Sequence, residues 1–126
     1  MIDTGKATIK TYGDIKYNII NINIYIDGEL LDIDMKNIYH AIIKKYSTPV
    51  NIICSRNKDN FYSINAATYM KINGKHVFNK IACIADDPVT IESFNSSKEA
   101  IFKDNQTKLF KTMDEGYHWL ISNVID

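Results

Sequence analysis

Apolar and polar residues alternate along the first part of the chain. Isoleucines occupy every second position over residues 20–26, with asparagine and tyrosine between them. This period of two is typical of a β-strand. The range Ala7–Ile26 is long enough for two antiparallel strands. Their turn is expected at Gly13-Asp14 or near residues 18–21, where the period is broken, and the register stays open.

The next segment has helical spacing. Apolar side chains recur at intervals of three and four between Asp34 and Tyr46, which predicts a helix with one face toward a core. Thr48-Pro49 ends this helix and precedes Val50–Cys54, whose continuous apolar character suits a strand covered on both faces. The centre of the chain is therefore predicted to be a β-α-β unit.

A second helix and strand follow after a polar stretch. Ser63 is the predicted N-cap of a helix that ends at Asn73-Gly74, because serine caps helix starts and glycine favours helix ends. A strand is expected over Phe78–Ala85. The segment Asp86-Asp87-Pro88 breaks it and begins a connecting stretch that runs to Phe94.

Two capping boxes mark the last part of the chain. The first, Ser96-x-x-Glu99, is expected to open a short helix through Phe102. A short strand follows at Lys108–Lys111. The second box, Thr112-x-x-Glu115, introduces a last helix whose apolar positions keep helical spacing to Val124.

The predicted order is β-β-α-β-α-β-α-β-α, an α/β fold with a single mixed, mostly parallel sheet and helices packed on it. The length of 126 residues is that of about one domain, so we expect residues 1–126 to form a single domain. Hydrophobic residues make up 45% and charged residues 24% of the chain, a balance typical of a globular protein.

The charge pattern excludes some classes of partner. Fifteen basic residues balance 15 acidic residues, and the absence of a basic run argues against nucleic acid as a partner. No segment approaches the ~20 continuous apolar residues of a membrane span, and residues 1–6 do not resemble a signal peptide. The expected location is the cytoplasm.

The sequence has no pattern typical of a metal site or of an enzyme active site. His40, His76 and His118 fall on different predicted elements without metal-ligand spacing. Cys54 and Cys83 lie in apolar runs and are expected to be reduced and buried in neighbouring strands. The chain has no nucleophile elbow or phosphate-binding loop. We therefore expect no metal, no cofactor and no catalysis.

Paired carboxylates occur at Asp32/Asp34 and at Asp86/Asp87. At helix starts and strand ends such residues usually cap orphan amides or favour the helix dipole. The alternative is an acidic surface that meets a basic partner. Either role is structural or binding, not catalytic.

The segment from Arg56 to Ser63 is the strongest binding candidate. It follows the carboxyl end of a predicted central strand and leads into a helix N-terminus, where open α/β sheets tend to bind ligands and anions. The candidate binding residues are Arg56, Asn57, Tyr62 and Ser63. The alternative is an ordinary polar connection in which Ser63 is a simple N-cap.

Three short sequence motifs resemble those of a known family. They are Ile53-Cys54-Ser55-Arg56-Asn57 with Tyr62-Ser63, Asn95-x-x-x-Glu99-x-x-Phe102, and Asp114-Glu115-Gly116-Tyr117-His118-Trp119-Leu120. In these motifs the chain resembles the STAS superfamily, the fold of bacterial anti-sigma-factor antagonists, and in particular small uncharacterised SpoIIAA-like proteins. The resemblance covers about Asp27 to Val124.

The resemblance implies a domain that acts by binding. In the antagonists a serine at this helix start is phosphorylated, and Ser63 takes the comparable place by element order. A phosphate there would alter partner binding. The Asp-Ser-Ser-Gly turn of the antagonists is replaced here by Phe61-Tyr62-Ser63-Ile64.

The favoured function is a non-enzymatic regulatory or protein-interaction module. The alternative is a carrier or sensor of a small apolar or lipid-like ligand, as in CRAL-TRIO-like relatives, which requires an internal cavity of several hundred Å³. A homodimer is also possible through an exposed edge strand near Lys108–Lys111 or residues 7–12.

Overall fold

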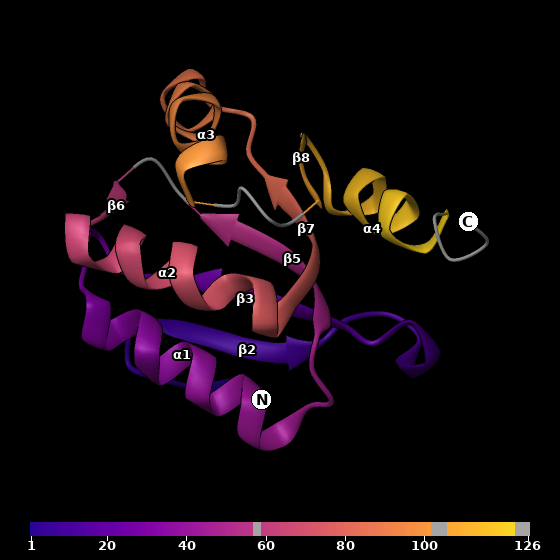
Figure 1. Ribbon diagram of the computed structural model, residues 1–126. Helices are drawn as coiled ribbons and strands as arrows, with labels where there is room; N and C mark the ends of the chain where they lie inside the picture. The colour runs from indigo at the N-terminus through magenta and orange to yellow at the C-terminus, as the bar shows by residue number, and fades with distance from the viewer. Residues whose placement is uncertain (57–58, 102–105, 123–126) are drawn as a thin grey trace.

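The computed structural model describes residues 1–56, 59–101 and 106–122 (Figure 1). Its main sheet has the strand order β1-β2-β3-β5-β7-β8. The strands, in that order, are Ile2–Asp3, Ala7–Thr11, Ile19–Ile24, Val50–Arg56, Phe78–Ile84 and Gln106–Phe110. The four helices are α1 (Asp32–Lys45), α2 (Ile64–Val77), α3 (Pro88–Ile101) and α4 (Met113–Ser122).

The sheet is mixed and mostly parallel, as predicted. β2 and β3 are antiparallel, with Ala7 opposite Ile24 and Thr11 opposite Ile20. This confirms the two antiparallel strands predicted over Ala7–Ile26 and fixes their register. β3, β5, β7 and β8 are parallel neighbours. The connection between β2 and β3 contains a short 3-10 helix, η1 (Ile15–Tyr17).

Helices pack against both faces of the sheet. Figure 1 shows α1 and α2 side by side across one face, and α4 beside β7 and β8. The adjacent strand residues Ile52 and Ile53 point to opposite faces, as the pleat of a strand requires. Ile52 belongs to the larger core with α1 and α2, whereas Ile53 packs with Leu120 of α4.

Helix α2 is longer than predicted. Ser63 is its N-cap, as expected, but the helix passes through Asn73-Gly74 and ends at Val77. Met70, Gly74 and Val77 continue its buried stripe at helical spacing. Burial of this stripe outweighs the ~1 kcal/mol that glycine costs in a helix interior.

Helix α3 corrects a second prediction. The stretch before Phe94 is not a connection, and Ser96 lies inside the helix instead of capping it. The helix begins at Pro88, and the Thr90 backbone N donates to Asp87 Oδ2 at 2.9 Å. Asp87 is thus an N-cap and Pro88 occupies the first helical position, where its fixed φ and missing N–H are tolerated.

Helix α4 begins as the sequence predicts. Thr112 Oγ1 accepts from the Glu115 backbone N at 3.2 Å, as an N-cap does. A Cβ at Gly116 would lie 3.2 Å from Ala82 Cβ, so the glycine lets the helix approach β7 closely. The predicted end at Val124 and the predicted helix residue Phe102 lie outside the described residues.

A second, two-stranded sheet was not predicted from the sequence. β4 (Gly28–Leu30) and β6 (Asn60–Tyr62) run parallel, with Glu29 opposite Phe61 and Leu30 opposite Tyr62. The Ser63 backbone N donates to the Leu30 carbonyl at 2.8 Å. This ribbon joins the start of α1 to the start of α2.

The proposed dimer edges differ in the structure. Lys108 lies on β8, one of the two edge strands of the described sheet. Residues 7–12 are partly covered, because β1 pairs with β2 at Thr8 and Ile9. The homodimer itself stays a prediction.

Candidate functional site

Ser63 lies at the junction of the β4–β6 ribbon and α2. Its Oγ accepts a hydrogen bond from the Ala66 backbone N at 3.0 Å, which satisfies one of the orphan amides of the helix start. The predicted N-cap role is confirmed. The side chain is half-buried, so the hydroxyl is near the surface without being detached from the fold.

Tyr62 has its side chain on the inner side of the same ribbon. It pairs with Leu30, which is fully buried, and it lines a cavity between the sheet and the helices. Its neighbour Phe61 faces outward, as alternation along a strand requires. Within three residues the chain therefore presents an exposed ring, a cavity-lining ring and a helix cap.

The other two candidate binding residues cannot be assigned contacts. Arg56 ends β5 and pairs with Ile24 through its backbone. The Arg56 side chain and the whole of Asn57 lie outside the described residues. Their proposed binding role stays a prediction.

Exposed apolar side chains gather at this end of the molecule. We call Leu31, Ile33, Phe61 and Ile64 the ribbon-end surface, and they are exposed by 40%, 51%, 54% and 86%. Leu31 precedes α1 and Ile64 opens α2, while Phe61 lies on the outer side of the ribbon that joins them. In Figure 1 the ribbon strand β6 lies beside the start of α2.

The paired carboxylates act mainly as caps. Asp34 Oδ2 accepts from the Leu31 backbone N at 2.7 Å and forms an ion pair with Lys6 Nζ at 2.8 Å. Asp87 caps α3. The capping prediction is thus confirmed for one member of each pair.

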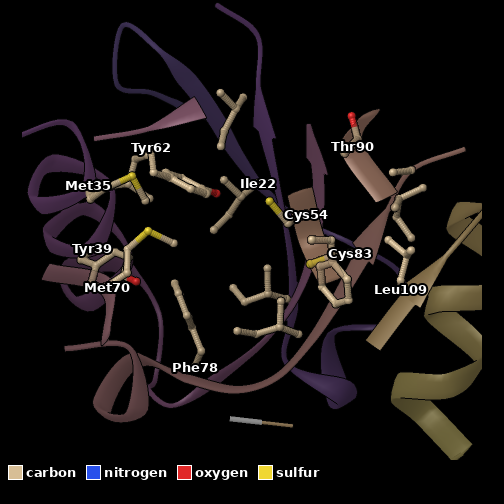
Figure 2. Close-up of a pocket in the computed structure, with 17 residues that line it drawn as sticks. Ile22, Met35, Tyr39, Cys54, Tyr62, Met70, Phe78, Cys83, Thr90 and Leu109 are labelled. Atoms are coloured by element: carbon tan, nitrogen blue, oxygen red, sulfur yellow. The ribbon is translucent and has the colours of Figure 1, made fainter. Parts of the chain in front are cut away.

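The cavity has a volume of about 60 Å³ and is shown with its 17 lining residues in Figure 2. Its walls are almost entirely apolar, with Met35 from α1, Met70 from α2 and Ile52 from the sheet. Cys54 and Cys83 also line it, on neighbouring strands as predicted and directly opposite each other, but they are not fully buried as expected. Both are half-buried thiols that form no disulfide.

The Tyr39 hydroxyl is the most unusual polar group of the cavity wall. Tyr39 is 1% exposed, and its Oη has no hydrogen-bond partner among the residues that the structure describes. Burial raises the pKa of this hydroxyl well above its usual value of 10.0. Tyr39 is therefore a neutral hydrogen-bond donor inside the core. In the sequence it was one residue of an amphipathic stripe, without a signal for this role.

An open hollow lies above the cavity at the carboxyl ends of the parallel strands. Its volume is about 730 Å³, and its polar wall includes Ser55, Asp59, Asp86 and Lys111. Three residues line both the hollow and the cavity, namely Ile24, Ile84 and Ala85. They form the boundary between the solvent-exposed edge and the apolar interior.

The histidines lie apart from this region. His40, His76 and His118 are exposed on α1, α2 and α4. In the described parts of the chain, no three histidine, cysteine or carboxylate side chains gather as a metal ion would require. Likewise, none of the described helices has the length and apolar character needed to cross a membrane.

Comparison with protein families finds no matching family model, and no curated protein matches. Among solved structures, the chain is similar to an uncharacterised protein of the DUF3478 family from Shewanella loihica PV-4, which has a SpoIIAA-like fold. The TM-score is 0.59 at 15% sequence identity, covering 90% of this chain and 91% of that one. At this identity the similarity concerns the fold, and the predicted SpoIIAA-like fold is confirmed.

Proposed function

We propose that this domain is a non-enzymatic regulatory module that binds a protein partner through the ribbon-end surface. The observation that carries the proposal is the exposure of Leu31, Ile33, Phe61 and Ile64 around the start of two helices. Large apolar side chains that gather on a surface mark interaction sites, because water is released when a partner covers them. The aromatic ring of Phe61 is of the type enriched at such interfaces.

Ser63 gives this surface a point of control. It lies between Tyr62 and the exposed Ile64, at the positive end of the α2 dipole. A phosphate on Ser63 would add about two negative charges beside apolar side chains, which disfavours their burial against a partner. Phosphorylation would therefore weaken partner binding while the helix start still accommodates the anion.

The test compares two double variants in cells of the source organism. Phe61→Asn with Ile64→Asn removes the apolar character of the ribbon-end surface. Ile43→Asn with Ile72→Asn is the control, because these side chains are exposed by 51% and 61% on the bodies of the same two helices.

Each tagged variant is purified gently, and the proteins that accompany it are quantified by mass spectrometry. The proposal expects a protein that accompanies the wild type and the control but is lost from the ribbon-end variant. If every accompanying protein is retained or lost equally in both variants, the surface is not the docking site.

A second candidate function is a sensor or carrier of a small apolar or lipid-like ligand. The specific observation in its favour is the apolar cavity that Tyr39 and Tyr62 line. Ligand pockets for drug-sized molecules have roughly 300–1,000 Å³, well above the 60 Å³ found here. The volume therefore favours a sensor of a very small molecule over a carrier of an acyl chain.

A further inference from the structure

The cavity combines apolar walls with a neutral hydroxyl group. Tyr39 and Thr90 line it, from α1 and α3, and their hydroxyls have no hydrogen-bond partner among the described residues. Figure 2 shows these two residues on opposite sides of the cavity. A buried hydroxyl that lacks a partner has lost its hydrogen bonds to water without replacing them, which destabilises the fold. A bound molecule that offers an acceptor to Tyr39 would recover part of that cost.

Tyr46 provides a comparison within the same part of the chain. It directly follows α1, and its hydroxyl is also buried without a partner among the described residues. Tyr46 does not line the cavity. The two tyrosines therefore share an unsatisfied hydroxyl and differ in access to the cavity.

We propose that the cavity is a binding site for a small uncharged carbonyl compound of about four heavy atoms, whose oxygen accepts a hydrogen bond from Tyr39 Oη. This inference rests on the second candidate function and is independent of the ribbon-end surface.

The size and the walls of the cavity define the class of ligand. An apolar cavity of ~150 Å³ admits benzene, so a volume of 60 Å³ limits the ligand to a smaller molecule. Walls formed by side chains such as Ile52, Met35 and Met70 cannot solvate a charge. Because Tyr39 is neutral and donates, the matching group on the ligand is an acceptor such as a carbonyl oxygen.

The hollow at the strand ends provides the route into the cavity. Ile24, Ile84 and Ala85 line both spaces, so a molecule that moves from the hollow to the cavity would pass these side chains. Ligands of open α/β sheets bind at this same edge. A molecule in the cavity would also lie against Tyr62, whose neighbours Phe61 and Ser63 form the outer surface.

The test is an NMR titration of the full chain with two probes of equal shape. Acetone carries the carbonyl oxygen, and isobutene has a methylene group in its place. Both are titrated into the wild type, Tyr39→Phe and Tyr46→Phe, and the amide shifts of Ile52, Met70 and Cys83 report occupancy. Unchanged spectra elsewhere show that each variant is folded.

The proposal expects both probes to bind the wild type at the cavity. Tyr39→Phe should weaken the binding of acetone by roughly five- to tenfold, the value of one hydrogen bond. The affinity for isobutene should stay unchanged. Tyr46→Phe should change neither. If Tyr39→Phe weakens neither probe, the carbonyl class is wrong but the cavity still binds ligand. If neither probe binds the wild type, the inference and the second candidate function both fail.

Discussion

Ser63 and Ala66 are joined by a hydrogen bond of 3.0 Å from the Ala66 backbone N to Ser63 Oγ, and this bond fixes the start of α2 beside the exposed Phe61. The same hydroxyl is therefore a structural cap and, in the function that we propose, also the group that is phosphorylated. A substitution at Ser63 must be interpreted with both roles in mind.

Ser63→Ala should lower the free energy of unfolding by about 1 kcal/mol, because one amide of the first helical turn loses its acceptor. Ser63→Asp should retain most of the stability, since aspartate also caps and complements the helix dipole. Urea denaturation followed by circular dichroism measures both. Thr68→Ala, at an exposed position within the same helix, is the control and should change stability by less. Equal losses for Ser63→Ala and Ser63→Asp would contradict the cap assignment.

Much of the fold could be predicted because local signals agree with the final packing. The alternation around Ile22 predicts a strand, and Ile22 pairs with Ile9 and Cys54 in the sheet. The cap at Ser63 is a local signal too, because its hydrogen bond joins residues that are only three positions apart in the sequence. Such signals do not depend on distant parts of the chain.

Other elements depend on contacts that the sequence does not display. β4 and β6 are three residues each, too short for a periodic pattern, and they exist because distant segments pair at Leu30 and Tyr62. The start of α3 differs from the prediction because Pro88 ends a strand as readily as it begins a helix. In the structure, the bond from Thr90 to Asp87 shows which reading is right.

The candidate site was only partly predictable. The segment that ends at Ser63 was identified from its place at a strand end, and that placement holds. The cavity is a property of three-dimensional packing between the sheet and three helices, so no local pattern marks it. In the sequence Tyr39 is one apolar position of a helical stripe, and only the structure shows that its hydroxyl has no hydrogen-bond partner among the described residues.

The turn at Gly13 provides a test of the packing between the β2–β3 connection and α4. Gly13 has a φ of +72°, and a Cβ there would collide with the ring of Tyr117. Gly13→Ala should therefore lower stability by the ~1 kcal/mol of left-handed strain and by about 1 kcal/mol more for the clash. Thermal unfolding measures the loss.

Gly5→Ala is the matched control for Gly13→Ala. Gly5 also has a positive φ, of +93°, but nothing lies within 4 Å of the added Cβ. Gly5→Ala should therefore lower stability only by the ~1 kcal/mol of left-handed strain, without a contribution from a clash. If the two variants lose the same stability, Tyr117 does not constrain the turn.

On the face of the sheet that α4 covers, Ile53 should contribute more to the free energy of unfolding than Trp119. Ile53 is 0% exposed, whereas Trp119 is only half-buried against Phe110. Ile53→Ala should cost about 2–5 kcal/mol because it leaves a cavity, and Trp119→Ala should cost less. A larger loss for Trp119→Ala in urea denaturation would show that α4 packs more tightly than the structure indicates.

Alkaline pH should reveal the buried hydroxyl of Tyr39. Its pKa is raised by burial, whereas in the unfolded chain it is near the usual value of about 10. Above that pH the unfolded state releases the proton and the folded state retains it, so ionisation favours unfolding. The stability that the wild type has below pH ~10 should therefore decline at higher pH. Tyr39→Phe lacks this group, so its urea midpoint should fall less between pH 8 and pH 11 than that of the wild type. Parallel declines in the two proteins would mean that the hydroxyl reaches water in the folded state, and a water-filled route past Ile24 and Ala85 would then be the first feature to examine.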